Sequence, residues 1–351
     1  MDEIGIGILG CGTIGPLHAE AATRLRGARL VAVADQREER AHALAKRYNV
    51  VARADLEGLL SVSGVDVVSV CTPSGTHAAL GCQIAESGRH VVLEKPIDVS
   101  LEAADEVITA CSSNGVLLSV IAQHRFDAGF VELHEAMHSG RLGRITLAEA
   151  RAWWYRTQAY YDADPWRGTW ALDGGVLTNQ GVHLVDLLLW LLGPVVSVFA
   201  RASTVAHDME AEDVIVVNLH FEKGALATLS VTTASYPGAP ETLSVTSERA
   251  SVTVKAGCLE TWDIAGEHEA GMSKPDTKSP LRSAALGSAF LSADAHRAQL
   301  QDVADALQQA RRPMVTGEDG RAALAVVHAA YESVRTGRDV PVTSGPVHKT
   351  R

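Results

Sequence analysis

A glycine-rich turn near the start of the chain constrains the fold more than any other feature. The segment GIGILGCGTIGPLHAEAA, residues 5–22, places an apolar run before the pattern Gly10-x-Gly12-x-x-Gly15 and a helix-forming run after it. Pro16 stands where a first helical turn tolerates proline. A second apolar run, residues 30–34, ends in Asp35. The order of strand, glycine turn, helix, strand and acid predicts a dinucleotide-binding unit.

This pattern also predicts how the cofactor is held. Glycines let the backbone approach a pyrophosphate at the positive end of a helix, so we expect cofactor contacts from Gly10, Gly12, Thr13 and Ile14. Asp35 would accept hydrogen bonds from ribose hydroxyls and repel a 2′-phosphate, which favours NAD over NADP. Arg37, two residues later, leaves NADP open as the alternative.

Strand and helix patterns keep alternating along the first third of the chain. Apolar runs at residues 66–71, 90–93 and 116–121 are separated by helical patterns at 78–86 and 101–111. These runs suit strands buried on both faces, so we predict an α/β fold with a doubly wound parallel sheet. Ligands bind at the carboxyl ends of such strands. The expected cofactor contacts there are Thr72, Ser74, His77, Glu94, Lys95 and Gln123. Arg125, two residues later, is an expected substrate contact.

A polar stripe interrupts the most apolar segment, residues 172–193. Asn179, His183 and Asp186 stand at i, i+4 and i+7, which places them on one face of an α-helix. One interpretation is a histidine satisfied within the core, and the other is a helix face that meets a polar site. Lys95 has the same two interpretations, a surface lysine or a functional group at the ligand edge of the sheet.

An aromatic cluster and a set of alternating segments follow. Residues 152–167 hold three of the six tryptophans and three of the six tyrosines, which suits either a sugar ring or an aromatic interface. We expect substrate contacts from Tyr155, Arg156, Trp166 and Arg167. Alternation over residues 195–205, 213–221, 225–236 and 242–255 predicts a mostly antiparallel open sheet with helices on one face. The other face is expected to pair with a second subunit in a homodimer or homotetramer.

Composition narrows the possible partners and location. The net charge of −11 argues against nucleic-acid or anionic-membrane binding. No apolar run approaches the ~18 residues of a membrane span. The five cysteines are scattered without a CxxC pair, which favours reduced thiols in the cytoplasm and no metal site. Residues 266–288 are rich in Gly, Ser, Lys and Pro and predict a mobile loop.

The chain resembles the Gfo/Idh/MocA family, named for glucose-fructose oxidoreductase and inositol dehydrogenase. The resemblance rests on the glycine turn with Asp35, on CTPSGTH at residues 71–77, on EKP at 94–96 and on GGVLTNQGVHLVD at 174–186. It implies an NAD-binding domain at residues 1–124 and a domain for substrate binding and oligomerisation at residues 125–351. In the family, the lysine of EKP and the histidine of the later helix face the nicotinamide and the hydroxyl being oxidised. These positions are Lys95 and His183 here.

The resemblance also implies a reaction. His183 would act as general base, Lys95 would stabilise the developing alkoxide, Asn179 would orient the hydroxyl and Asp186 would hold the His183 tautomer. Inositol dehydrogenases carry Asp where this chain has Asn179, which is similar to UDP-sugar uronate 3-dehydrogenases and suggests C3 of a pyranose. A nucleotide sugar, an amino sugar or an aminoglycoside stays open as substrate. The alternatives are a glycoside hydrolase that retains NAD and oxidises its substrate transiently, and a non-enzymatic NAD-dependent sensor.

Overall fold

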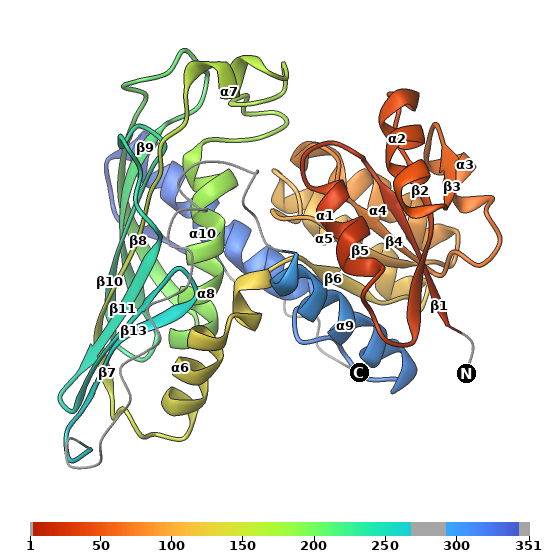
Figure 1. Cartoon of the computed structure of the whole chain (residues 1–351). Helices are drawn as coiled ribbons and strands as arrows, with labels where there is room; N and C mark the ends of the chain where they lie inside the picture. The colour runs from red at the N-terminus through yellow and green to blue at the C-terminus, as the bar shows by residue number, and fades with distance from the viewer. Residues whose placement is uncertain (1–2, 268–292, 344–351) are drawn as a thin grey trace. The chain divides into compact units, whose positions relative to one another are not determined.

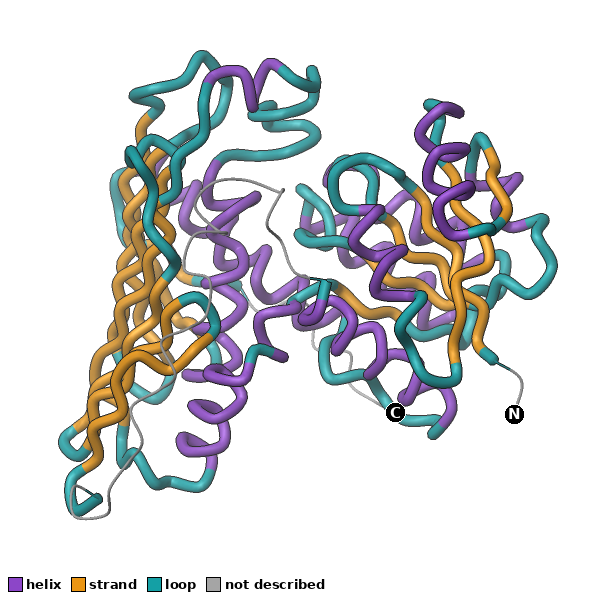
Figure 2. The backbone as a smooth tube through the Cα atoms, in the orientation of Figure 1, coloured by secondary structure: helices purple, strands orange, loops and turns teal. Residues whose placement is uncertain are grey.

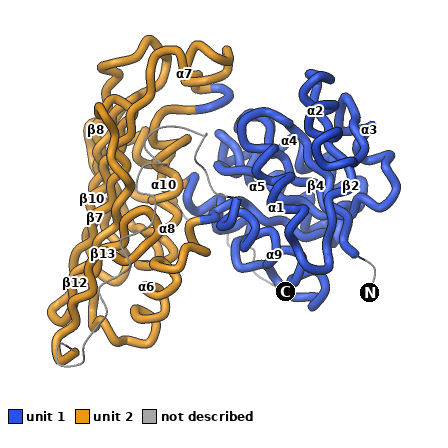
Figure 3. The backbone as a smooth tube through the Cα atoms, in the orientation of Figure 1, with its two compact units in different colours: residues 1–123, 171–173, 291–324 blue, residues 124–170, 174–290, 325–351 orange. Residues whose placement is uncertain are grey.

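The computed structural model describes residues 3–267 and 293–343, which form two compact units. The first contains residues 1–123, 171–173 and 291–324, and the second contains residues 124–170, 174–290 and 325–351 (Figure 3). The chain therefore returns to the first unit after leaving it, a return that the expectation of two continuous segments did not include. The mobile loop expected at residues 266–288 lies, from residue 268 on, outside the described residues.

The first unit is built on a six-stranded parallel sheet in the order β3-β2-β1-β4-β5-β6. The strands are β1 Ile4–Leu9, β2 Ala28–Ala34, β3 Val51–Arg53, β4 Val67–Val70, β5 His90–Leu93 and β6 Leu118–Val120. Side chains of β4 are buried along the whole strand, as expected for a parallel sheet covered on both faces. The predicted doubly wound fold is confirmed, and the strand order reverses between β1 and β4.

Helices alternate with these strands along the chain, as expected for a doubly wound sheet (Figure 1). They are α1 Gly15–Ala22, α2 Glu38–Tyr48, α3 Leu56–Leu60, α4 His77–Glu86 and α5 Leu101–Ser113, with a short 3-10 turn η1 at Ser74–Thr76. Pro16 lies in the first turn of α1, as predicted. The sequence supplies the side-chain caps of two helices, because Asp55 accepts from Gly58 N in α3 and Ser100 accepts from Ala103 N in α5.

Helix α9, Asp294–Gln308, completes the first unit from the far end of the chain. It packs beside α1 and contributes to the core that contains Ile8 and Val33. Its Gln299 is fully buried and reaches the end of β6, accepting from Ala122 N at 2.9 Å and donating to the Val120 carbonyl at 2.8 Å. Burying an amide is favourable only when its donor and acceptor are paired, so this residue fixes α9 to the sheet.

The second unit is built on an eight-stranded sheet in the order β13-β12-β11-β7-β10-β9-β8-β14. Its strands are β7 Ile145–Trp153, β8 Val195–Ser203, β9 Val214–Phe221, β10 Leu226–Thr232, β11 Thr242–Ser247, β12 Ala250–Lys255, β13 Cys258–Ile264 and β14 Val340–Pro341. The β7–β10 pair is parallel and the other pairs are antiparallel, which confirms the mostly antiparallel prediction. The alternating segment 242–255 forms two strands, because Ser247 Oγ accepts from the amides of Arg249 and Ala250 and closes a turn.

Helices cover one face of this second sheet (Figure 2). They are α6 Ala128–His138, η3 Leu177–Gly181, α8 Val182–Leu192 and the later part of α10 Gly317–Thr336, while α7 Gln158–Asp162 lies in a long connection after β7. The short turn η2, Gln123–Phe126, begins with the last residue of segment 1–123 of the first unit and continues into the second unit. Alanines 148, 150 and 152 of β7 are buried on the helix-covered face. Within the described ranges, no helix is long and apolar enough to cross a membrane.

Candidate functional site

The three glycines of the turn after β1 have different surroundings. Gly10 has φ +98°, and an ideal Cβ there would lie 2.6 Å from the Cys71 carbonyl oxygen. A Cβ on Gly15 would lie 2.0 Å from the Gly10 carbonyl oxygen. Around Gly12 the nearest atom to such a Cβ is Arg40 Nη1, at 3.6 Å. Packing therefore requires the first and third glycines, whereas the second leaves the open approach that a pyrophosphate needs.

The acid after β2 closes the same turn. Asp35 Oδ2 accepts from Cys11 N at 2.7 Å and Oδ1 accepts from Arg37 N at 2.8 Å. These bonds hold the carboxylate beside the glycine turn, and each oxygen keeps lone-pair capacity for a ribose hydroxyl. Thr13 and Ile14 lie between the turn and α1, with Ile14 at the N-cap position. The residues present thus fit a dinucleotide, and Arg40 is a neighbour that the sequence pattern did not single out.

Two loops at the carboxyl edge of the sheet are joined by His77. Its Nδ1 is 2.8 Å from the Pro96 carbonyl and its Nε2 is 2.9 Å from the Thr72 carbonyl, and the ring is buried. The hydroxyls of Thr72 and Thr76 hydrogen-bond each other at 2.8 Å, and Ser74 is buried at the start of η1. Of the predicted cofactor contacts, Thr72 and His77 therefore belong to one hydrogen-bonded framework. Gln123, also buried, ends the first unit.

Glu94 lies in a buried cluster with two histidines. Glu94 Oε1 is 2.8 Å from His18 Nε2 and 3.5 Å from His296 Nε2, and Glu94 Oε2 accepts from Lys95 N at 3.0 Å. Burial opposes charge on both partners, yet hydrogen bonding to His18 and His296 holds the pKa of Glu94 well below its ordinary value. Contacts with Cys71 and Glu94 outweigh burial and raise the pKa of His18 to about 10.

These three residues also satisfy the spacing of a metal site, since their ligand atoms lie within 4.8 Å of one another. Because His18 and Glu94 already share a hydrogen bond of normal length, and His18 Nδ1 lies 2.8 Å from Ser69 Oγ, we interpret the cluster as an ion-pair network. The sequence predicted Glu94 as a cofactor contact. Its hydrogen bond from Lys95 N fixes the backbone on which Lys95 stands. His18 and His296 were not predicted.

In the second unit, Asn179 and His183 share one partly exposed face. Every residue from 173 to 188 is buried except these two. Their spacing differs from the predicted α-helix, because Leu177–Gly181 forms a π-helical turn before α8 begins at Val182. Such turns are frequent at functional sites. Asp186, which the sequence placed on the same stripe, is buried, since its carboxylate points to Arg125.

Arg125 forms a two-point ion pair with Asp186. Nε donates to Oδ2 at 2.9 Å and Nη2 donates to Oδ1 at 2.6 Å, with both side chains buried. This geometry satisfies a buried guanidinium with a carboxylate of the same unit. Arg125 was predicted as a substrate contact and Asp186 as the partner of His183. Those roles stay predictions, and the ion pair is the arrangement that the structure shows.

His124 is a neighbour of His183 that the sequence did not indicate. The two rings meet edge to face with centroids 5.0 Å apart, and His124 Nδ1 lies 2.7 Å from Asp127 Oδ2. Burial lowers the pKa of His124, but the hydrogen bond to Asp127 and the negative charges of Asp127, Glu241 and Asp186 together outweigh burial and raise it. The sequence offered only one sign of this arrangement, which is that His124 and Asp127 stand at i and i+3.

The predicted aromatic cluster contains stacked cations. The guanidinium carbon of Arg167 lies 4.3 Å from the Tyr160 ring centroid and 4.5 Å from that of Trp166. Arg156 lies 5.3 Å from Tyr160 and 5.4 Å from Trp154. All four distances are within cation–π range. The cluster therefore holds its two arginines by aromatic faces. Tyr155 lies against Tyr236, four residues after the end of β10.

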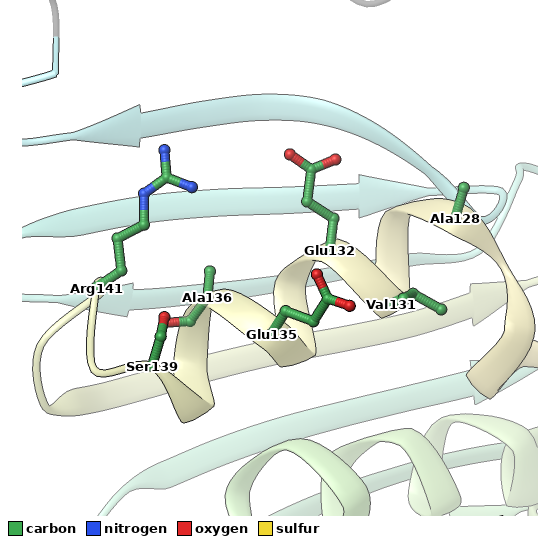
Figure 4. Close-up of a pocket in the computed structure, with 7 residues that line it drawn as sticks. All are labelled: Ala128, Val131, Glu132, Glu135, Ala136, Ser139 and Arg141. Carbon is green, nitrogen blue, oxygen red and sulfur yellow. The ribbon is translucent and has the colours of Figure 1, made fainter.

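A shallow groove along α6 is separate from these residues. It is lined by the positions shown in Figure 4: Ala128, Val131, Glu132, Glu135, Ala136, Ser139 and Arg141. Arg141 is bound by Glu267 through two hydrogen bonds. None of the predicted site residues lines it. Its open form and mixed charge do not resemble the concave apolar pocket of a small-molecule site.

A parallel Rossmann sheet with an open glycine turn and an acid at the end of β2, followed by a unit on an eight-stranded sheet, defines a two-domain NAD-dependent oxidoreductase. Two family models match, one described as an oxidoreductase family with an NAD-binding Rossmann fold over residues 4–122 and one as the GFO/IDH/MocA C-terminal domain over residues 130–253. The chain belongs to the GFO/IDH/MocA family.

Several relatives that match along the whole chain are named as dehydrogenases. The WlbA dehydrogenase of Bordetella pertussis, solved with NADH and UDP-GlcNAcA, is 32% identical, covers 97% of this chain and 99% of its own, and has a TM-score of 0.84. GenD2 from gentamicin A biosynthesis, solved with NAD, is 25% identical with coverage of 98% and 97% and a TM-score of 0.83. An inositol 2-dehydrogenase of Saccharopolyspora erythraea is 28% identical over 98% of this chain and 96% of its own length.

Proposed function

We propose that the protein oxidises a secondary hydroxyl group of a sugar-type substrate, with C3 of a pyranose as the position oxidised. The observation that carries the proposal is the partial exposure of Asn179 and His183 in an otherwise buried helical segment. A core histidine would be buried with its neighbours, whereas these two side chains are partly exposed. The names of the WlbA and inositol 2-dehydrogenase relatives support a substrate with ring hydroxyls.

Each proposed residue has one chemical task. NAD supplies the hydride acceptor when bound. His183 accepts the hydroxyl proton, because imidazole titrates near neutral pH. Lys95 donates a hydrogen bond to the substrate oxygen and stabilises the negative charge that develops there. Asn179 orients the hydroxyl. Lys95 follows β5 at the ligand edge of the first sheet, which supports its assignment to this task.

The substrate class depends on charge near the aromatic cluster. Arg156 and Arg167 would serve the carboxylate or diphosphate of a nucleotide sugar acid, and the WlbA relative, solved with UDP-GlcNAcA, supports this class. Asp162 would serve the ammonium group of an amino sugar, and the GenD2 relative supports that class. Asp186 neutralises Arg125, and Asp164 Oδ2 lies 3.8 Å from Arg167 Nε, so the cationic contribution of Arg167 is reduced as well.

The decisive experiment follows reduced nicotinamide by its absorbance at ~340 nm. Purified protein is given NAD or NADP with UDP-sugars, free sugars, inositols and aminoglycosides in turn. Formation of NADH with one pyranose class supports the proposal if kcat falls on the order of 10²-fold or more in His183→Ala and in Lys95→Ala. Both variants must still bind NADH, measured by fluorescence. Wild-type kcat in both would contradict the mechanism. Release of free sugar without NADH would indicate a hydrolase, and binding without turnover would indicate a sensor.

The second sheet supports a homo-oligomer. On its outer face, Leu147 and Leu226 are neighbours in the β7–β10 register and are 50% and 54% exposed, and Val216 of β9 is 45% exposed. Apolar side chains gathered on one face favour self-association as a homodimer or homotetramer. Light scattering of the double variant Leu147→Lys, Leu226→Lys should show a smaller species than the wild type.

The five cysteines are free thiols, which supports a cytoplasmic location.

A further inference from the structure

The glycine pair at the start of the segment 174–186 has a structural cause that the proposed function does not use. An ideal Cβ on Gly175 would lie 1.6 Å from Glu212 Oε2, and one on Gly174 would lie 2.5 Å from Thr178 Cβ. Gly174 also has φ +74°, where a side chain is disfavoured. The absence of side chains therefore lets the Glu212 carboxyl group lie directly on the backbone that leads into the π-helical turn.

Glu212 is hydrogen-bonded to that turn at several points. Its backbone carbonyl accepts from Val176 N at 2.9 Å, and its Oε1 accepts from Leu177 N at 2.9 Å. The Tyr331 hydroxyl of α10 donates to the same Oε1 at 2.9 Å and lies 2.8 Å from the Thr178 hydroxyl. The first amides of a helix need acceptors from outside it. Glu212 therefore acts as the N-terminal cap of the η3–α8 helix, although it is distant in sequence.

Two functional positions depend on the geometry of this cap. Leu177 is the first residue of η3, and Asn179 is two residues further, with its amide donating to the Gly175 carbonyl at 3.0 Å. His183 follows in the first turn of α8. A shift of the Leu177 amide by a few tenths of an ångström therefore changes where both side chains project.

We propose that Glu212, acting with Tyr331 and Thr178, is a positioning residue that sets the π-helical turn carrying Asn179 and leading to His183, and that gain of a proton by Glu212 loosens this turn.

The electrostatics around Glu212 support a change of charge near neutral pH. Burial raises the pKa of Glu212 to about 7, while hydrogen bonds from Leu177 N and Tyr331 oppose this rise. Asp213, the adjacent carboxylate, adds to the rise and accepts four hydrogen bonds of its own from residues 205–207. Within the described part of the chain, Glu212 Oε2 is buried without a hydrogen-bond partner.

The sign of the effect follows from hydrogen-bond strength. A carboxylate accepts more strongly than a neutral acid, so the turn is held firmly above pH 7 and less firmly below it. Glu212→Gln has nearly the same shape as the acid form and carries no charge. It therefore fixes the weaker state at every pH. Tyr331→Phe removes one donor to the carboxylate and should move the titration of Glu212 upward.

The first test needs no substrate. Infrared spectra across pH 5.5 to 8.5 should show a carboxylic C=O band that titrates near 7 and is missing in Glu212→Gln. Hydrogen exchange of peptides over residues 174–186, corrected for intrinsic rates, should show protection that falls about fivefold to tenfold from pH 8 to pH 6 in the wild type. Glu212→Gln should show, at both pH values, the low protection that the wild type shows at pH 6. Equal protection in both proteins at both pH values would overturn the proposal.

The second test rests on the proposed function. At pH 8 the kcat of Glu212→Gln should fall to the level that the wild type shows on full protonation of Glu212, about fivefold to tenfold lower, and the NADH affinity should be unchanged. The control is Glu210→Gln, an exposed glutamate of the same loop that accepts from Trp170 N. If no substrate is found, the proposed function fails and the exchange result still decides the role of Glu212. Wild-type kcat in Glu212→Gln at pH 8 would overturn that role.

Discussion

His18 Nε2 lies 2.8 Å from Glu94 Oε1, which ties helix α1 to the end of β5, one residue before Lys95. Removing one partner of a buried ion pair leaves the other charge unpaired, at a cost of about 3–5 kcal/mol. Because Glu94 keeps His296 Nε2 at 3.5 Å and the Lys95 amide as partners, His18→Leu should lower the free energy of unfolding by less than that, about 1.5–3 kcal/mol, measured by urea titration. His42→Leu, an exposed histidine of α2, is the matched control and should change it by less than about 0.5 kcal/mol. If the two variants change the free energy of unfolding by similar amounts, the ion pair adds nothing to stability.

The same pair predicts a pH dependence of stability. The pKa of His18 rises from 6.5 to about 10 in the fold, so its contribution is complete below pH 6.5 and disappears as the pH rises through 10. The pKa of Glu94 falls well below 4.5, so its contribution is complete above pH 4.5 and disappears as the pH falls. The stability difference between wild type and His18→Leu should be largest between pH 4.5 and 6.5 and should decline toward pH 10. A difference that grows with pH over this range would contradict the assignment.

The ion pair of Arg125 and Asp186 predicts a different outcome for two related variants. Arg125→Met should lower the free energy of unfolding by about 3–5 kcal/mol, because Asp186 is left charged and buried. The double variant Arg125→Met, Asp186→Leu should recover most of this loss, since neither charge remains. Urea unfolding of the two variants and the wild type measures the recovery. If Arg125 instead serves mainly the substrate, Arg125→Met will keep wild-type stability and raise KM.

The sequence predicted the parallel sheet, the glycine turn and the polar face with Asn179 and His183, because these features depend on periodicity and on residues close in the chain. It did not predict His18 with His296, or Glu212 with Tyr331. Each of these pairs joins residues that are distant in sequence, and a lone histidine or glutamate gives no periodic signal. The π-helical turn was missed for the same reason, since its geometry depends on the Glu212 cap supplied by a later loop.

The contrast between Gly10 and Gly12 predicts that one substitution affects folding and the other affects cofactor binding. Gly12→Ala meets only the Arg40 side chain at 3.6 Å, so its free energy of unfolding should change by less than about 0.5 kcal/mol. Its Kd for NAD should nevertheless rise on the order of tenfold or more, because the methyl group occupies the pyrophosphate approach. Gly10→Ala, at φ +98° and 2.6 Å from the Cys71 carbonyl oxygen, should be destabilised. Calorimetry gives both quantities, and unchanged NAD affinity in folded Gly12→Ala would contradict the assigned binding turn.

Asp35 is expected to set the preference for NAD over NADP. Asp35→Ser keeps a short polar side chain and removes the negative charge that repels a 2′-phosphate. Loss of charged hydrogen bonds to the ribose should weaken NAD binding about tenfold or more, whereas NADP binding should weaken less or improve. The ratio of the two Kd values by fluorescence titration is the readout. Asp55→Ser, whose carboxylate accepts from Gly58 N at the start of α3, is a control that should leave the ratio unchanged.

Gly175 and Glu212 provide a steric test of the cap. A methyl group on Gly175 would overlap the Glu212 carboxyl group, so Gly175→Ala should lower the free energy of unfolding by about 1–3 kcal/mol. Glu212→Ala removes that carboxyl group and leaves Leu177 N without its acceptor. In the double variant the new methyl group enters the vacated space, so the combined loss should be smaller than the sum of the single losses. A simple sum would mean that the two residues act independently. The glycine would then be required for backbone reasons, and the close approach of carboxyl group and backbone would carry no energetic coupling.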